Sequence, residues 1–155
     1  MAGAMAASGY YDIRTFDPHE GLGYLVGGVR RALLEALAKE LAPIELSGPQ
    51  AIVILKIAIG EGSHAADFCR ELQYDPGAMT RLIDRLEKRG FLRRVRSPSD
   101  RRAIRLELTD EARAALPRIK IAAITVFNRF LRGFSRGEAE QLIGYLKRLM
   151  ANANR

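Results

Sequence analysis

The hydrophobic pattern of the chain changes its period at Gly90, and this change constrains the fold more than any other feature. Before Gly90, apolar residues recur every three or four positions, as on the buried face of a helix. After it they alternate with charged residues, as in a half-buried strand. The pattern predicts a helix over Pro76–Arg89, followed by a β-hairpin of Leu92–Arg96 and Ile104–Leu108.

Positive charge is concentrated in the same part of the chain. Residues 81–105 hold ten Lys or Arg residues and three acidic residues, and their net charge of +7 equals that of the whole chain. Because the chain has 25 basic and 18 acidic residues, 15 of each sign remain elsewhere and balance. A cationic patch of this size is typical of a nucleic acid-binding surface. The basic residues of the helix fall opposite its apolar face and are Arg81, Arg85, Lys88 and Arg89.

Apolar periodicity and capping residues predict five further helices. Ser47 and Ser135 each open a capping box, while Ser63 and Thr109, and Asp75 before the basic helix, are expected N-caps. The Ile and Val residues of segment 51–59 would also suit a strand, but the capping box at Ser47 favours a helix. The expected helices are Pro18–Leu41, Ser47–Gly60, Ser63–Leu72, Asp110–Arg132, which can bend at Pro117, and Ser135–Met150.

The order of these elements describes a winged helix-turn-helix. The helices Ser47–Gly60 and Ser63–Leu72 come first. They are followed by a short turn between Leu72 and Asp75, then by the basic helix and the hairpin. The expected fold class is therefore mainly α, with about six helices and a β-hairpin wing. The basic helix can enter the major groove of duplex DNA, whose width admits an α-helix, while the hairpin reaches sideways along the duplex.

Composition and motifs exclude several other classes of protein. One cysteine, Cys69, allows no intramolecular disulfide, and its place on the apolar side of a short helix favours a buried structural thiol. No apolar run approaches the roughly 20 residues that span a bilayer, and the first residues lack the features of a secretion signal. We therefore expect a cytoplasmic protein that does not bind a membrane. No phosphate-binding glycine loop, nucleophile pair or metal-binding motif appears, so we expect no enzyme, no cofactor and no metal.

Two stretches, MTRLIDRLEKRGFLRR and SPSDRRAIRLELTDEAR, resemble the MarR family of bacterial transcription regulators. The similarity covers the chain from about Leu22 to Met150. Its most specific part is Asp100 with Arg102, followed by the Leu-Thr pair at 108–109. A generic helix-turn-helix would not require this wing sequence.

The resemblance implies an intertwined homodimer built from helices at about 18–42 and 109–152, with a DNA-binding lobe at about 47–108. Residues 18–155 would form a single domain behind a flexible tail of residues 1–17. Members of the family usually repress genes from a pseudo-palindromic operator, and many release DNA when a small aromatic or phenolic ligand binds. The family's oxidant sensors carry a reactive cysteine near the start of the first helix, which this chain lacks. An architectural DNA-binding protein without an effector remains the alternative.

The expected DNA contacts fall on the basic helix and on the hairpin. Side chains in the first turns of a recognition helix meet base edges, and Arg81 can pair with a guanine, worth about 1–3 kcal/mol of discrimination. An arginine at the tip of the wing can enter a narrow minor groove, while Asp100 is expected to fix the geometry of the wing. Arginines of the strands are expected to contact phosphates or to be solvent-exposed charges, and not to read bases. The full predicted set is Ala78, Thr80, Arg81, Arg85, Arg94, Arg96, Ser97, Asp100, Arg101 and Arg102.

Aromatic residues cluster near the start of the first helix. Phe16, His19 and Tyr24 mark a region that can line the family's ligand cleft, between the dimerisation helices and the DNA-binding lobe. Packing in the core, or in a mobile tail, explains the same cluster equally well. We therefore predict a ligand-binding region here and no individual ligand contact.

Overall fold

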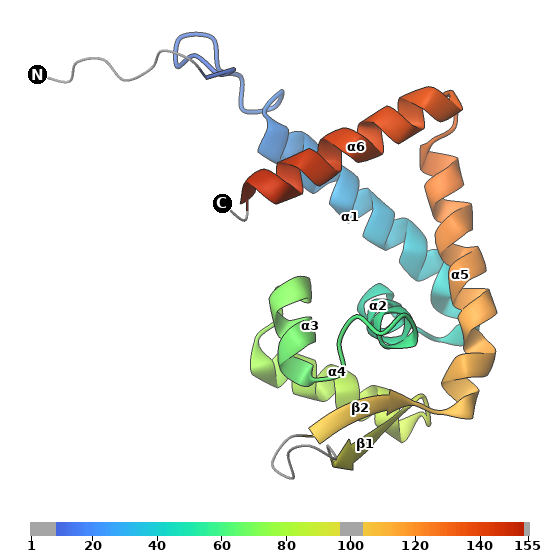
Figure 1. The fold of residues 1–155 in the computed structure, drawn as a ribbon. Coiled ribbons are helices and arrows are strands. Elements are labelled where there is room, and N and C mark those ends of the chain that lie inside the picture. The colour runs from blue at the N-terminus through green and yellow to red at the C-terminus, as the bar shows by residue number, and fades with distance from the viewer. Residues whose placement is uncertain (1–8, 97–103, 154–155) are drawn as a thin grey trace, which may run out of the picture.

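The computed structural model describes residues 9–96 and 104–153. Within these residues the chain has six α-helices, one 3-10 turn and a two-stranded antiparallel hairpin, which confirms the predicted fold class (Figure 1). The elements are α1 Leu22–Leu41, η1 Ala42–Ile44, α2 Gly48–Ala58, α3 Ala65–Leu72, α4 Pro76–Lys88, β1 Leu92–Arg96, β2 Ile104–Leu108, α5 Asp110–Phe130 and α6 Arg136–Ala153.

The helices form two layers that α5 joins (Figure 1). α1 and α6 cross in one layer, and α2, α3, α4 and the hairpin form a separate lobe, which we call the lower lobe. α1 packs along α5, and α5 also contacts α2 and β2. The lower lobe is therefore held to the other layer by α5 and by the C-terminal end of α1.

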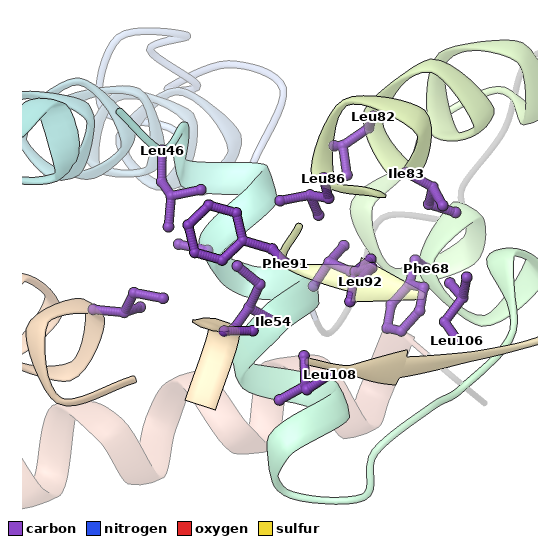
Figure 2. Packing of buried hydrophobic residues seen from close by; sticks show 14 of the residues in the cluster. Leu46, Ile54, Phe68, Leu82, Ile83, Leu86, Phe91, Leu92, Leu106 and Leu108 are labelled. Atoms are coloured by element: carbon purple, nitrogen blue, oxygen red, sulfur yellow. The ribbon is translucent and has the colours of Figure 1, made fainter. Parts of the chain in front are cut away.

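A hydrophobic core fills the lower lobe and reaches the base of α5 (Figure 2). Phe91 and Leu92, where the hairpin begins, belong to the same cluster as Ile54 of α2 and Leu86 of α4. Burying one such side chain stabilises the fold by about 1.5–3 kcal/mol, so this core fixes α4 in the lobe. The most deeply buried side chains include Leu41, Ile54, Phe68, Met79, Leu82, Ile83 and Leu86.

Hydrogen bonds confirm four of the predicted N-caps. In each, a side-chain oxygen of the capping residue accepts the backbone N–H of the residue three positions later, which satisfies a donor that the helix itself leaves free. The Ser47 and Ser135 caps are completed as capping boxes. The capping pairs are Ser47 with Gln50, Asp75 with Ala78, Thr109 with Ala112, and Ser135 with Glu138.

The start of α3 differs from the prediction by one residue. His64, and not Ser63, is the N-cap residue. The carboxylate of Asp67 accepts the backbone N–H groups of Ser63 at 3.1 Å and of His64 at 3.0 Å. The start of α3 is thus fixed by an acidic side chain that reaches back to the two residues before the helix, and not by the Ser63 hydroxyl.

α1 begins at Leu22, four residues later than the predicted Pro18. Gly21 occupies the N-cap position and has no side chain with which to cap the helix. The hydroxyl of Tyr11 accepts the backbone N–H of Leu22 at 2.7 Å instead. A residue from the preceding segment therefore caps α1, which no local pattern around Pro18 reveals.

The ends of the later elements follow the prediction closely. α4 ends at Lys88, and Gly90 has a φ of +74°, a left-handed conformation that favours glycine and stops the helix as predicted. α5 contains Pro117 and continues to Phe130, two residues short of the predicted end. Among the described residues, no single helix is long and apolar enough to cross a bilayer. The pair formed by residues 22–44 and α2 reaches that length and hydropathy, but it is bent by 79°.

Candidate nucleic-acid interface

α4 has one buried apolar side and one exposed cationic side. The apolar residues Met79, Leu82, Ile83 and Leu86 are at most 2% exposed, and they hold the helix in the lobe. Arg81, Arg85 and Lys88 lie on the exposed side. Within the described residues, no ion pair engages any of these three cations. Their charge is therefore available to an anionic partner.

The first turn of α4 is fixed by its cap. Asp75 Oδ1 accepts the N–H of Ala78 at 2.9 Å, and this hydrogen bond is the main cause of the lowered pKa of Asp75. The hydroxyl of Thr80 donates to the carbonyl oxygen of Pro76 at 2.8 Å. The proton of Thr80 is thus used inside the helix, while its oxygen can still accept a hydrogen bond from outside. Ala78 is half-buried beside them.

On one flank of α4, Arg94 joins β1 to the helix. Its guanidinium donates to Asp84 at 2.6 Å and also to Glu87, and its backbone N–H donates to Glu87 at 3.2 Å. These carboxylates, Asp84 first, raise the pKa of Arg94. The predicted phosphate contact of Arg94 took no account of these two partners, which occupy its guanidinium. The structure gives Arg94 a part in joining the hairpin to α4.

On the other flank, the guanidinium of Arg89 is bound by the corner that follows α1. It donates to the backbone carbonyl of Ile44 at 3.2 Å, to the carbonyl of Glu45 and to the Glu45 carboxylate at 3.3 Å. It also lies over the ring of Phe91, 5.2 Å from its centre. The sequence analysis grouped Arg89 with the exposed basic residues, and this placement is wrong, because the corner after α1 binds its side chain.

The hairpin carries two further cations toward solvent. Arg96 and Arg105 are exposed, and no ion pair engages them in the described part of the chain. Arg93 is different, because Glu107 on the opposite strand binds it at 2.8 Å. The predicted wing-tip residues Ser97, Asp100, Arg101 and Arg102 lie outside the described residues, so their roles stay predictions.

Comparison with known proteins agrees with this geometry. A model of the MarR family matches residues 44–103. The regulator BilQ of Clostridioides difficile is 26% identical over 81% of this chain and 84% of its own length. The regulator SarZ of Staphylococcus haemolyticus is 30% identical over 65% of this chain and 67% of its own length. The transcriptional repressor CouR, solved bound to a 23-mer DNA duplex, has a TM-score of 0.75 and 30% identity, covering 84% of this chain and 93% of CouR.

The chain belongs to the MarR family. It is therefore a DNA-binding transcriptional regulator, of a family whose members are regulators and not enzymes. The apo structure of Escherichia coli MarR, at 24% identity and a TM-score of 0.73, has the same fold over 83% of this chain. The resemblance in the wing and basic helix thus led to the correct family.

Beyond the DNA-binding lobe, this MarR-family chain exposes an apolar face on α1, α5 and α6. Large apolar side chains there are between about a third and two thirds exposed. An apolar cavity of about 660 Å³ lies within this face, between α1, α2, α5 and α6, and residues such as Leu22, Val26 and Phe127 belong to both. Exposed apolar faces of this extent mark sites of interaction in soluble proteins. The exposed residues include Leu22, Leu25, Val26, Val29, Ile121, Ile124, Phe127, Ile143, Tyr145, Leu146 and Met150.

The aromatic residues of the N-terminal segment pair with one another and are not among the residues that line this cavity. Tyr11 and Phe16 meet edge to face with ring centres 5.3 Å apart, and His19 and Tyr24 do so at 5.0 Å. Figure 1 shows their segment at the end of α1 farthest from the lower lobe. Their expected place in a ligand cleft between the dimerisation helices and the lobe therefore stays a prediction. Cys69 packs against the core on the predicted side of α3, but it is half-buried and not fully buried as predicted.

Proposed function

We propose that this chain represses transcription by binding a pseudo-palindromic operator as a homodimer, and that a small aromatic ligand releases it from DNA. The observation that carries the proposal is the exposed cationic side of α4. Arg81, Arg85 and Lys88 lie there opposite a buried apolar side, and no ion pair within the described residues neutralises them. A rigid cationic helix of this kind suits the major groove of duplex DNA.

Each side chain of α4 takes a role that follows from its place. Arg81, in the second turn, pairs with a guanine, and Thr80 accepts a hydrogen bond from a base or its bridging water. Ala78 is small and lets the backbone approach the duplex. Arg85 and Lys88 bind phosphates, which position the helix without reading sequence.

The hairpin extends the proposed interface along the duplex. Arg96 and Arg105 bind phosphates beside the groove, and the tip reaches the minor groove. Arg94 is reassigned from a phosphate contact to the attachment of the hairpin on α4, because Asp84 and Glu87 bind its guanidinium. The proposed tip residues, which lie outside the described residues, are Ser97, Asp100, Arg101 and Arg102.

The exposed apolar face of α1, α5 and α6 supports the homodimer. A second copy that covers this face removes apolar surface from water, at about 25 cal/mol per Å². Two-fold symmetry then presents two copies of α4 to half-sites one helical turn apart, about 34–36 Å. A pseudo-palindromic operator follows from this symmetry.

The apolar cavity supports a small-molecule effector. Its volume of about 660 Å³ lies in the range of sites that bind small molecules. Arg30 is the charged residue among those that line it in the described part of the chain, and it adds almost no polar surface to the lining, so the cavity suits an apolar aromatic ring. A ligand between α1, α2 and α5 would alter how the lower lobe sits on α5. The region near Phe16, His19 and Tyr24 stays a prediction without this support.

The test starts from duplexes selected out of a random-sequence library by the purified protein. Affinity for a selected duplex should fall steeply as salt is added, since phosphate contacts release counterions. Benzoate, as a simple aromatic acid, should weaken this binding in a gel shift. Little sequence preference, together with indifference to a panel of aromatic acids, would favour the architectural DNA-binding protein.

The repressor acts on the chromosome, so the proposal places the chain in the cytoplasm.

A further inference from the structure

The C-terminal end of α4 is attached to both α1 and α5 through three consecutive residues, 89–91. Arg89 binds the corner at Ile44 and Glu45, where the chain leaves α1. The hydroxyl of Thr109, the N-cap of α5, donates to the carbonyl of Gly90. The backbone N–H of Thr109 donates to the carbonyl of Phe91 at 3.2 Å. The corner that follows α1 and the start of α5 thus both meet the basic helix at one end.

The corner that binds Arg89 is built to present acceptors. Glu45 has a φ of +53°, a left-handed conformation that is rare for a residue with a side chain. This conformation turns the chain sharply and leaves the carbonyls of Ile44 and Glu45 accessible to one guanidinium. The planar fork of arginine can bind several acceptors at once, which the single ammonium of lysine cannot do in the same geometry. The Arg89 side chain is 31% exposed, so water competes only in part.

We propose that Arg89 is a positioning residue for DNA recognition, which sets the tilt of α4 relative to α1. Arg81 lies eight residues from Arg89, about 12 Å along the helix, so a tilt of about 10° at the Arg89 end moves Arg81 by about 2 Å. In a dimer the two copies of α4 move together, and this shift changes the half-site spacing they fit. The inference rests on the proposed function, because spacing has meaning only for two recognition helices on one duplex.

The test compares Arg89→Gln with Lys88→Gln, a neighbour that loses the same charge from the exposed side of α4. Each protein is titrated with a duplex selected by the wild-type protein and with the same duplex carrying one extra base pair between its half-sites. The wild-type protein should lose at least about tenfold in affinity on the longer duplex. Lys88→Gln should bind both duplexes less tightly with the same ratio between them. Arg89→Gln should reduce that ratio to about threefold or less.

Arg89→Lys keeps the charge and one carbonyl contact, so its ratio should lie between those of the wild-type protein and Arg89→Gln. Urea unfolding shows whether Arg89→Gln folds. If it does not fold, Arg89→Lys alone tests the positioning role, and its ratio of affinities for the two duplexes should be at least about twofold lower than that of the wild-type protein. A wild-type ratio in the folded variants overturns the positioning role and leaves the proposed function intact. If the wild-type protein enriches no duplex from the random-sequence library, both the positioning role and the proposed function are overturned.

Discussion

Arg94 on β1 donates a hydrogen bond of 2.6 Å to Asp84 on α4, and its second partner, Glu87, lies one turn further along the same helix. Asp84 and Glu87 are the two acidic residues of α4. Unpaired, they would repel a polyanion beside the cationic side chains of the same helix. Arg94 therefore does two things, since it holds the hairpin against α4 and counters negative charge at the interface.

We expect Arg94→Ala to weaken binding to selected and random duplexes by similar factors, because it frees two carboxylates and releases the hairpin from α4. The side chain is 30% exposed, so the loss of stability should be on the order of 1 kcal/mol. Fluorescence anisotropy with both kinds of duplex measures the first effect. Urea unfolding measures the second.

A charge-neutral background separates this role from a direct phosphate contact. Arg94→Ala combined with Asp84→Asn and Glu87→Gln should recover part of the lost affinity, because the freed carboxylates are then gone. No recovery at all would mean that Arg94 itself binds a phosphate, as the sequence first suggested.

Arg81 and Lys88 share the exposed side of α4 but should affect DNA binding differently. Arg81→Ala should reduce the preference for selected over random duplex by about 1–3 kcal/mol, because a bidentate contact to a base is lost. Lys88→Ala should weaken both kinds of binding alike and lower the salt dependence by about one counterion. Titrations at several salt concentrations provide both quantities. Equal loss of specific and random binding in the two variants would refute this division of roles.

The features that the sequence predicts best are local ones. A cap such as Ser47 or Thr109 and its partner lie three residues apart, and the residues between them decide whether the bond can form. The change of period at Gly90 is equally local, because it depends on which side chains one helix face or one strand face can bury. The order of helices and the hairpin therefore followed from short patterns.

The side-chain roles that the sequence missed depend on distant partners. Arg89 binds a corner 44 residues away, and Arg94 binds Asp84 ten residues away across two elements. Periodicity placed Arg89 on the cationic side because it gives the direction of a side chain around the helix axis. It does not show which other part of the chain packs against the helix in that direction. Tyr11 capping Leu22 is a third case, since Gly21 itself offers no cap. Only the packed fold brings these partners together.

Asp67 should make stability depend on pH at the acidic end. The N–H of His64, followed by that of Ser63, lowers the pKa of Asp67 from its ordinary value of 3.8. A carboxyl whose pKa is lower in the folded state contributes its full stabilisation above the unfolded pKa, and loses it as pH falls through the folded one. The wild-type protein should therefore have a higher melting temperature than Asp67→Asn at neutral pH. This difference in melting temperature should shrink as pH falls below 3.8. Thermal unfolding followed by circular dichroism measures it, and an unchanged difference in acid would contradict the role of this carboxylate.

Ile143 on α6 offers the sharpest test of the homodimer. Its side chain is 45% exposed and does not line the apolar cavity, so Ile143→Asp should leave the folded chain intact. A charge in an apolar interface must be desolvated on association, so the dimer dissociation constant should rise by at least about tenfold, or about 1.4 kcal/mol. Gln141→Asp adds the same charge two positions away, on the other side of α6, and should leave the dimer unchanged. Light scattering with size-exclusion chromatography measures both variants. If Ile143→Asp dimerises as tightly as Gln141→Asp, the copies must meet through another surface, and the half-site spacing expected from an α1, α5 and α6 interface no longer holds.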